Sequence, residues 1–453
     1  MSAEKFFELL KKGENIFLTG PAGTGKTFTL KKALEMYPNN FVVTSSTGIS
    51  ALNLMEGART IHSFSGIGTK NNSDFNNHVK FSWFISGLTN EVVNGILGCK
   101  KLIIDEISMI HPDQLDLIDR IFQAVRVDIR PFGGIQMIFA GDALQLPAVQ
   151  KGADFGTPNS WFFESRSWKM ANVKTVQLTE IKRTDNVEFA KMLCRIRTMD
   201  FTSEDFKALK SLSNKHLEHE PVKLFATNRK SDEYNQQKLN ELTTPLLTIK
   251  AKWRGNQDLV KEIKKSVLAQ DILNMKVGAR VMILVNKSMD FLNDDADYVN
   301  GSTGIFLGLE TRTTAREHWI TERDPVTFEI TNIYKDKKTY HVLKIQLDSG
   351  PIVFIKRHTW EMGEKIENEH GKLQAEAEYS QYPVRLAWSI TVHKSQGMSL
   401  DYVDLDCEGI RTDNQFYVAV SRAKTLEGLK VTNLKSMAIK SCPKALDFYR
   451  NNI

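Results

Sequence analysis

The sequence predicts an α/β protein with two parallel-sheet domains and a smaller β-rich part, on three observations. A short apolar run at 16–18 passes through a glycine-rich turn into a helix-forming stretch at 27–34. Two further apolar runs, each typical of a buried strand, end at the acidic residues Asp105 and Asp142. A second set of helix-like and strand-like stretches lies far downstream, between 386 and 431. Because ligands of open α/β sheets bind beyond the carboxyl ends of parallel strands, the polar residues there are the first candidates for a site.

The composition is that of a folded protein of enzyme size. The chain has 453 residues, of which 41% are hydrophobic, enough for about three domains with separate cores. No apolar run approaches the roughly 18 residues of a membrane helix, and residues 1–15 are charged and amphipathic rather than signal-like. We therefore expect a cytoplasmic protein with no membrane partner, of prokaryotic or viral origin.

The charge balance excludes no class of function, and the spacing of the cysteines predicts reduced thiols. Lys and Arg total 60 against 54 Asp and Glu, a mild excess that permits nucleic-acid binding without requiring it. The four cysteines are far apart and lack the spacing of a metal site or a disulfide framework, so we expect reduced thiols. They are Cys99, Cys194, Cys407 and Cys442.

The stretch GPAGTGKT at 20–27 has the residues of a phosphate-binding loop. Its glycines permit positive φ and leave room for backbone N–H groups to surround an anion at a helix N-terminus. In the pattern G-x-x-x-x-G-K-[ST], Lys26 reaches the β- and γ-phosphates and the Thr27 hydroxyl binds Mg²⁺. A chance match in a glycine-rich turn is the alternative, which the strand and helix on either side make less favourable. The predicted nucleotide-binding residues are Gly20, Pro21, Ala22, Gly23, Thr24, Gly25, Lys26 and Thr27.

An acidic pair follows the second apolar run, in KKLIIDEISMI. Beside a phosphate-binding loop, Asp105 can hold Mg²⁺ and Glu106 can deprotonate the water that attacks the γ-phosphate. In isolation, the pair would be read as solvated acids at the end of a strand. The phosphate-binding loop upstream favours the catalytic interpretation.

A third strand, at 136–140, ends at Gly141 and Asp142 and is followed by Gln145. An uncharged amide can bind either the γ-phosphate or the attacking water, so Gln145 is the candidate sensor of hydrolysis. A loop glutamine that faces water is the alternative. The ends of all three strands are expected to face one crevice.

The far stretch LAWSITVHKSQGMSLDYVDLD, at 386–406, is read as a helix-like segment before Gly397 and a strand at 402–406. A buried segment at 416–420 then ends near Arg422, ahead of a strand at 429–431. We expect Arg422 to be exposed and suited to reach across a cleft as an arginine finger. A surface arginine in a salt bridge is the alternative for this residue alone.

Two further stretches differ from the α/β pattern. Residues 68–83 are polar and rich in Asn, and we expect them to form a small insert. Between 285 and 382, apolar and polar residues alternate in short runs separated by turn residues. This spacing is typical of short β strands in a small barrel.

Several motifs in a fixed order make the chain resemble superfamily 1 DNA helicases. They are GPAGTGKT, STGISALNL, RTIHSFSG, IIDEIS, PFGGIQMIFAGDALQLP, LTEIKR, FATNR, VHKSQG and VAVSRA. The stretch EISMIHPDQLDLIDRIFQAVRVDIRPFGGIQ looks like the signature of the Pif (petite integration frequency) branch, relatives of RecD in superfamily 1B. The resemblance covers nearly the whole chain.

The resemblance implies two RecA-like motor domains with a small wedge and an SH3-like β-barrel insert. The expected ranges are 1–190 for the first motor, with the wedge at about 66–84, then 191–284 and 383–453 for the second, and 285–382 for the barrel. It also implies an ATP-driven helicase that moves 5′ to 3′ on single-stranded DNA and unwinds 5′-tailed duplex and, as a further expectation, quadruplex DNA. We expect a monomer, with oligomers on DNA as the alternative. DNA repair, recombination and telomere maintenance are expected processes, among which the sequence does not choose.

Position by position, the resemblance implies the same nucleotide roles as the residues themselves and adds others. Arg183 and Arg422 would close on the γ-phosphate, although the family often has Arg-Gln where this chain has Arg183-Thr184. Gln396 and Gly397 would join the nucleotide site. The family's adenine-contacting glutamine has no counterpart before Gln114, which leaves base selectivity open. The expected DNA contacts are Thr47, Gly48, His62, Phe64, Thr391, His393 and Lys394.

Two of these DNA contacts have a structural alternative, and the function has two rivals. Phe64 can pack inward as a core residue, and His393 can be a structural histidine. An ATP-gated DNA clamp would bind without travelling, and a nucleotide kinase or GTPase would use the phosphate-binding loop alone. The second α/β set argues against a kinase.

Overall fold

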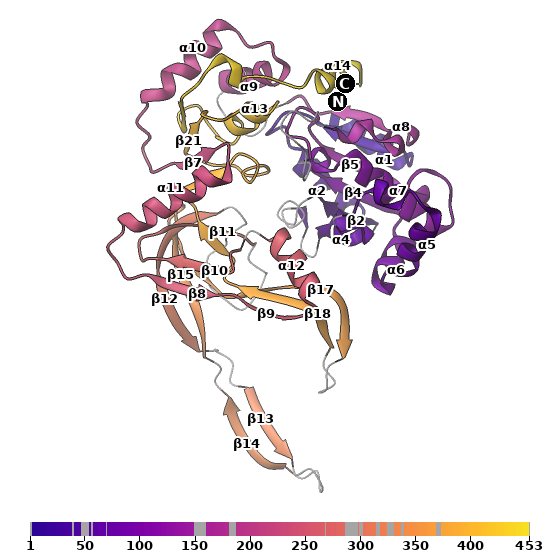
Figure 1. The fold of residues 1–453 in the computed structure, drawn as a ribbon. Helices are drawn as coiled ribbons and strands as arrows, with labels where there is room; N and C mark the ends of the chain where they lie inside the picture. Colours follow the sequence, from indigo (N-terminus) through magenta and orange to yellow (C-terminus); the bar gives the residue numbers. More distant parts are fainter. Residues whose placement is uncertain are drawn as a thin grey trace. The chain divides into compact units, whose positions relative to one another are not determined.

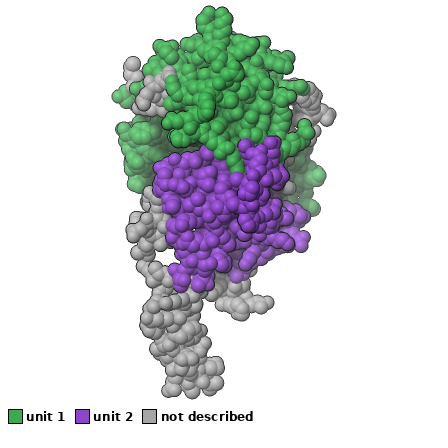
Figure 2. Space-filling view, turned by 90° about the vertical axis from the view of Figure 1, so that its left-hand side faces the viewer, with its two compact units in different colours: residues 1–235, 388–453 green, residues 236–387 purple. Residues whose placement is uncertain are grey.

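In the computed structural model the chain forms two compact units. Residues 1–235 and 388–453 form the first, and residues 236–387 form the second (Figure 2). The structure describes residues 2–38, 40–46, 54–55, 58–68, 70–148, 160–180, 187–267, 269–285, 298, 302–313, 318–323, 330–336, 339–367 and 373–452. Within these ranges no helix is long and apolar enough to cross a membrane. The first unit contains two parallel sheets, which confirms the predicted α/β class.

The first sheet has six strands, and all of its neighbours are parallel. In spatial order they are β3 (Arg59–Thr60), β2 (Phe41–Ser45), β4 (Lys101–Asp105), β5 (Gln136–Gly141), β1 (Ile16–Thr19) and β6 (Lys174–Gln177). The central strands are nearly continuous apolar runs because helices cover both faces, as parallel sheets require. The predicted strands at 16–18 and 136–140 are therefore confirmed, together with the run that ends at Asp105.

Successive residues of the central strands pack into two different cores. Ile16 and Leu18 of β1 face one core with α1 and α2, while Phe17 faces the other with α4, α6, α7 and α8. This is the period of two that a strand imposes on its side chains. These helices are labelled beside the strands of the first sheet in Figure 1. The helices are α1 (Ser2–Lys11), α2 (Lys26–Met36), α4 (Ile61–Ser65), α5 (His78–Ser86), α6 (Asn90–Gly98), α7 (Pro112–Arg126) and α8 (Arg166–Met170).

The second sheet of this unit has four parallel strands. In spatial order they are β20 (Ser389–Thr391), β7 (Val222–Phe225), β21 (Val403–Asp406) and β22 (Leu429–Thr432). The segments between and beside them include α9 (Val187–Thr198), α10 (Ser203–Ser211), α11 (Asn228–Glu241), α13 (Gln415–Val420) and α14 (Pro443–Asn452). The predicted strands at 402–406 and 429–431 correspond to β21 and β22. The predicted helix before Gly397 is wrong, because that stretch holds the short strand β20 and a turn.

The last helix packs on the first sheet rather than the second. Its Phe448 ring stacks on Phe163 with centroids 4.1 Å apart and planes at 3°, and Ala445 is buried in the core that contains Phe17. Residues 443–452 were expected within the second motor domain. Their aromatic and small side chains instead complete the aromatic cluster on one face of the first sheet.

Short 3-10 turns connect several of these elements. They are η1 (Asn72–Phe75), η2 (Ile107–Met109), η3 (Pro131–Gly134), η4 (Phe162–Glu164), η5 (Leu212–Asn214) and η6 (Ser436–Ala438). The expected insert at 66–84 contains η1 and most of α5, and Phe75 and Phe81 pack its apolar side into the core that contains Phe17.

The second unit is mostly antiparallel β structure and is larger than the expected insert at 285–382. One sheet contains, in spatial order, β16 (Ile352–Ile355), β15 (Thr339–Leu347), β12 (Thr303–Thr313), β11 (Arg280–Ile283) and β19 (Val384–Leu386). The others pair β17 (His358–Glu367), β18 (Leu373–Gln381) and β9 (Lys252–Gly255), β10 (Ile272–Met275) with β8 (Leu247–Lys250), and β13 (His318–Arg323) with β14 (Ile330–Asp336). Helix α12 (Gln257–Ser266) packs on β18 and β17. Residues 236–284 belong to this unit because β9 pairs with β18 and β11 pairs with β19, two strands near its C-terminal end.

Candidate nucleotide site

The phosphate-binding loop connects β1 to α2, as the sequence predicts. Gly25 is the residue before the helix and has φ 83°, a left-handed conformation that favours glycine. Gly20 has no room for a side chain, since a Cβ there would lie 2.4 Å from the Leu178 carbonyl oxygen and 2.7 Å from Thr24 Oγ1. These two glycines are therefore required by geometry, one for its dihedral angle and one for close backbone approach.

Lys26 begins α2 and folds back over the loop that precedes it. Its Nζ donates to the carbonyl oxygens of Gly20 at 2.7 Å and Pro21 at 3.1 Å. Burial lowers the pKa of Lys26, and the nearby carboxylates of Asp142 and Glu106 oppose that shift. A desolvated ammonium surrounded by exchangeable carbonyl contacts is suited to accept a phosphate anion.

The acidic pair lies where β4 ends. Asp105 is 8% exposed, and Glu106 adopts φ 52° and ψ 44° in the left-handed region. A non-glycine residue in that region is strained and is found at functional sites more often than elsewhere. Glu106 Oε2 is buried and has no hydrogen-bond partner among the residues that the structure describes. An unpaired carboxylate oxygen in this place could accept a proton from water.

The donor set at the loop fits Mg²⁺ only together with nucleotide. Mg²⁺ is usually bound by one or two protein oxygen ligands together with phosphates and waters. Thr27 and Asp105 would supply one hydroxyl and one carboxylate. The described ranges hold no group of three or more His, Cys, Asp or Glu side chains that could bind a metal by themselves. The chemistry of the donors agrees with a metal that arrives with the triphosphate.

Gln145 lies at the meeting point of the two sheets of the first unit. Its side-chain Oε1 accepts a hydrogen bond from Gln396 Nε2 at 3.3 Å, and its backbone oxygen accepts from Asn414 Nδ2 at 3.1 Å. Gln396 Nε2 also lies 3.4 Å from Ser108 Oγ. Next to it, a Cβ on Gly397 would lie 3.9 Å from Glu106 Oε1. The structure thus brings the two predicted glutamines together and places Gly397 beside Glu106.

Arg422 is buried rather than exposed, which corrects the expectation for its surroundings. Only 2% of its surface is accessible, and its Nε donates to the Val418 carbonyl at 2.9 Å. One Nη donates to the carbonyls of Ser395 at 3.3 Å and Met398 at 3.0 Å, and the other to Ser421 Oγ at 2.9 Å. Burial lowers the pKa of Arg422, and the charge of Glu106 acts against that shift. The guanidinium therefore holds the loop at 395–398 in place.

Three predicted residues lie outside the described residues. They are Arg183, Thr47 and Gly48. Their predicted roles remain predictions.

The other expected DNA contacts differ in exposure. Phe64 is fully buried and meets Phe122 edge to face, with centroids 5.9 Å apart, so its ring cannot stack on a base from this position. His62 is partly exposed, with Nε2 3.4 Å from Gln114 Oε1. Thr391, the last residue of β20, is buried, while His393 and Lys394 in the turn that follows are partly exposed. Burial lowers the pKa of His393, which favours its neutral form.

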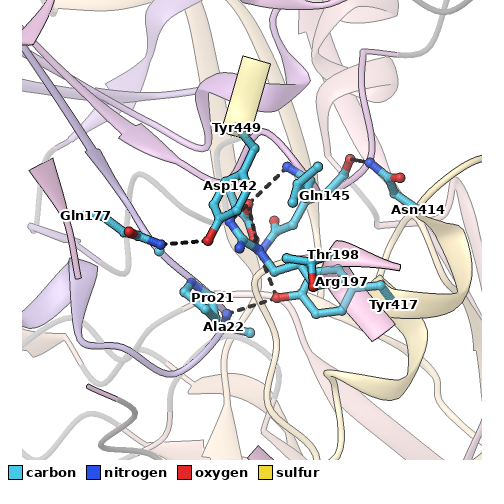
Figure 3. A network of polar contacts seen from close by, with 12 residues as sticks. Pro21, Ala22, Asp142, Gln145, Gln177, Arg197, Thr198, Asn414, Tyr417 and Tyr449 are labelled. Carbon is cyan, nitrogen blue, oxygen red and sulfur yellow. Dashed lines mark hydrogen bonds and ion pairs between the residues drawn. The ribbon is translucent and has the colours of Figure 1, made fainter. Parts of the chain in front are cut away.

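Sequence reasoning missed a buried polar network behind the phosphate-binding loop (Figure 3). Arg197 of α9 binds the carboxylate of Asp142 through Nε at 2.9 Å and Nη at 2.8 Å. The Tyr417 hydroxyl lies 3.4 Å from Asp142 Oδ2 and accepts from the Ala22 N–H at 3.1 Å. A signal was present, because Arg197 continues the apolar stripe of α9 at the spacing of Phe189 and Leu193.

The Asp142–Arg197 pair is a buried ion pair whose charges are maintained. Although burial alone would raise the pKa of Asp142, the Arg197 guanidinium holds it below its usual value. The Arg197 guanidinium carbon also lies 4.5 Å from the ring centroid of Tyr449 on α14. Tyr449 in turn accepts a hydrogen bond from Gln177 Nε2 at 2.8 Å. The tip of β5 is thus tied to α9, α13 and α14.

Comparison with known proteins places this geometry in a family. Residues 5–206 match the family described as PIF1-like helicase. The ATP-dependent DNA helicase Pif1 of Psychrobacter sp. (strain PRwf-1) is 32% identical over 467 residues, covering 97% of this chain and 68% of that protein. The human ATP-dependent DNA helicase PIF1 is 30% identical over 443 residues, covering 97% of this chain and 61% of its own length. The chain thus spans about three fifths of the human relative.

Solved structures extend the similarity to the whole fold. The Pif1 helicase from Candida albicans has a TM-score of 0.76 at 29% identity, covering 99% of this chain and 98% of that one. Bacteroides sp Pif1 in complex with ADP-AlF4 has a TM-score of 0.74 at 28% identity, with 99% and 96% covered. Its counterpart with ADP-AlF3 and single-stranded DNA has a TM-score of 0.70 at 29% identity, with the same coverage. The chain belongs to the PIF1-like helicase family.

Proposed function

We propose that the chain is an ATP-dependent DNA helicase that translocates 5′ to 3′ on single-stranded DNA and unwinds duplex DNA. The observation that supports this most is the contact between Gln145, after β5 of the first sheet, and Gln396, after β20 of the second. A motor needs two halves that respond to one nucleotide, and this contact joins them beside the acidic pair. The named activity of the relatives agrees with the proposal.

The nucleotide chemistry follows from the residues at the first sheet. Lys26 exchanges its contacts with the Gly20 and Pro21 carbonyls for the β- and γ-phosphates of ATP. Thr27 and Asp105 would hold Mg²⁺, which neutralises phosphate charge when bound. Water attacks the γ-phosphorus in line, the bond to the β-γ bridging oxygen breaks with its electrons on ADP, and Glu106 accepts the proton. Gln145 orients that water or the γ-phosphate.

Arg422 contributes mainly through the loop that it holds. Its guanidinium could reach a phosphate only after losing four hydrogen bonds, three to backbone carbonyls and one to a serine hydroxyl. Hydrogen bonds to charged groups contribute about 1.5–3 kcal/mol each, so this exchange requires a strong ionic contact in return. We propose that Arg422 positions Gln396 and Gly397 in the resting state. With Arg183 it would supply positive charge to the γ-phosphate only after closure.

The proposed DNA track uses the partly exposed polar residues at the edges of both sheets. His393 and Lys394 would contact the DNA backbone, with Thr391 supporting their turn through its hydroxyl, which accepts from the Lys394 N–H at 3.4 Å. His62 would contact the strand from the side of the first sheet, and Thr47 and Gly48, which lie outside the described residues, are proposed as further contacts. Backbone contacts of this kind are independent of sequence, as a translocating protein requires. Solved relatives are Bacteroides Pif1 bound to single-stranded DNA and two coordinating Pif1 helicases at forked double-stranded DNA.

Movement would come from closure and release of two RecA-like motor domains, one around each parallel sheet. The first is the expected 1–190, and the second, expected at 191–284 and 383–453, keeps 191–235 and 388–453, because residues 236–387 form the second unit. Only a nucleotide that binds the closed state better than the open one can shift that equilibrium, and hydrolysis removes the difference. We assign strand separation to the insert at 66–84 as a wedge. The β-rich second unit, which includes the residues 285–382 expected to form an SH3-like insert, would guide the DNA. Quadruplex DNA is a further proposed substrate, and single molecules or pairs on DNA are both compatible with the mechanism.

Tailed duplexes test the function directly. The full-length protein should displace a strand from a duplex with a 5′ single-stranded tail, in the presence of ATP and Mg²⁺, and leave the 3′-tailed duplex intact. Single-stranded DNA should also stimulate its ATP hydrolysis. Stimulated hydrolysis without displacement of either duplex would indicate an ATP-gated clamp. Hydrolysis insensitive to DNA would favour a nucleotide kinase or GTPase.

A further inference from the structure

We propose that the Tyr417 hydroxyl is a positioning group that couples the phosphate-binding loop to the second parallel sheet. Tyr417 lies on α13, which follows β21 of the second sheet, while both groups that its hydroxyl contacts follow strands of the first. These groups are the Ala22 N–H at 3.1 Å and Asp142 Oδ2 at 3.4 Å (Figure 3). The inference rests on the proposed function, because it concerns how that nucleotide site is controlled.

Asp142 gives the phenol a fixed partner. Its side chain is fully buried, and the Arg197 guanidinium contacts both of its oxygens. Its Oδ1 also accepts the Leu144 N–H at 3.0 Å. Because this carboxylate is held from two directions, it does not move with Tyr417. Any displacement of α13 relative to the tip of β5 therefore changes the distance between the hydroxyl and Asp142 Oδ2.

The hydrogen bonds of the hydroxyl have a defined direction. Tyr417 is 3% exposed, and burial together with the charge of Asp142 raises the pKa of its phenol. The phenol therefore keeps its proton and donates it to Asp142. Its oxygen accepts from Ala22, which is the remaining arrangement for a neutral hydroxyl between an N–H and a carboxylate.

Ala22 lies in the part of the loop that the lysine also holds. Lys26 Nζ and Thr24 Oγ1 both donate to the Pro21 carbonyl, at 3.1 Å and 3.0 Å. The start of the loop is therefore bound from inside by its own side chains and from the second sheet by Tyr417. Since N–H···O bonds span only about 2.7–3.2 Å, a shift of α13 by about half an ångström would release Ala22. Binding of DNA at the turn after β20 could therefore alter the phosphate-binding loop through a shift of α13.

A pair of matched variants separates coupling from packing. Tyr417→Phe removes the hydroxyl that touches Ala22, and Tyr449→Phe removes a hydroxyl from the same network that bonds to Gln177 instead. In the full chain, we expect Tyr417→Phe to lower the DNA-stimulated kcat about five- to tenfold, the effect of one hydrogen bond, with KM for ATP changed by no more than about twofold. Tyr449→Phe should leave both constants within about twofold. Hydrogen exchange of the 20–27 peptide should accelerate in the first variant and not in the second.

Three outcomes would overturn the assignment. Equal losses of kcat in both variants would show that the hydroxyls serve only to fill the interior. An unchanged kcat in Tyr417→Phe would show that the loop does not need the contact. Unchanged hydrogen exchange at 20–27 in that variant would show that the hydroxyl does not hold the loop. If the unaltered protein fails to hydrolyse ATP with DNA, the proposed function falls, while the exchange measurement still decides whether Tyr417 holds the loop.

Discussion

The two sheets of the first unit use their principal cations in opposite ways. Lys26, on the first sheet, contacts two carbonyls of the same loop that would receive phosphate, and its pKa is lowered by burial. Arg422, on the second, spreads its guanidinium over the backbone of α13 and the turn at 395–398. Lys26 is partly exposed and Arg422 is buried, so the surroundings of each cation, more than its residue type, distinguish the one proposed to bind phosphate from the one that holds a loop.

The largest expected effect concerns the first sheet, where the hydrolysis step is proposed to occur. Glu106→Gln removes the proposed proton acceptor and keeps the size of the side chain at 106, where the backbone is left-handed. ATP hydrolysis should fall about 10²- to 10⁴-fold, the usual contribution of a general base. Binding of a fluorescent ATP analogue and of single-stranded DNA should be retained, since neither needs the carboxylate. Hydrolysis at an unaltered rate in this variant would remove Glu106 from the mechanism.

The next effect contrasts the two cations themselves. Lys26→Ala should reduce hydrolysis about 10²- to 10³-fold, as removal of a charge-stabilising donor does, and leave the thermal unfolding temperature unchanged or higher, because a desolvated charge is lost. Arg422→Ala should lower that temperature as well as activity, since it removes the four hydrogen bonds that hold the turn at 395–398 on α13. Calorimetry and steady-state kinetics on both variants measure the four quantities. Unfolding of Lys26→Ala at a lower temperature than Arg422→Ala would show that Lys26, not Arg422, is the cation that stabilises the fold.

What could be predicted from sequence is what is encoded locally. The glycine turn at 20–25 and the buried strands around it depend on residues that are neighbours in the chain, so pattern and spacing were sufficient. The segment at 389–392 was misread as helical because a short buried strand and a buried helix are both apolar on every side. Arg422 was expected to be exposed because nothing local indicates which distant carbonyls will surround it.

The polar network shows the same limit at longer range. Tyr417 and Ala22 are 395 positions apart, and Asp142 and Arg197 are 55 apart. A charged residue on the apolar stripe of α9 indicates that a partner exists, but its identity depends on the packing of α9 against the tip of β5. The position of α14 on the first sheet is likewise set by tertiary aromatic contacts that no local pattern specifies.

A smaller effect, measured as stability, concerns the ion pair between Asp142, after β5, and Arg197 of α9. Arg197→Met leaves Asp142 buried without its cation, and we expect a loss of about 3–5 kcal/mol in the free energy of unfolding at neutral pH. The pKa of Asp142 is lowered in the folded state, so its stabilising contribution is present above its ordinary pKa and is lost as pH falls through the folded value. Denaturant titrations should show the gap between variant and parent narrowing below about pH 4. A gap that does not depend on pH would mean that packing, not charge, holds α9.

The smallest expected effect concerns DNA binding. It compares two of the predicted DNA contacts that differ in burial. Lys394 is partly exposed in the turn after β20, while Phe64 lies wholly within the core. Lys394→Ala should weaken binding of single-stranded DNA uniformly across sequences and reduce the slope of log affinity against log salt by about one, as loss of one phosphate contact does. Phe64→Leu should lower the unfolding temperature and leave that salt slope unchanged, because its ring touches only protein. Fluorescence anisotropy at several salt concentrations distinguishes the two. An equal change of slope in both variants would show that the effect comes from altered folding, and it would remove Lys394 from the DNA track.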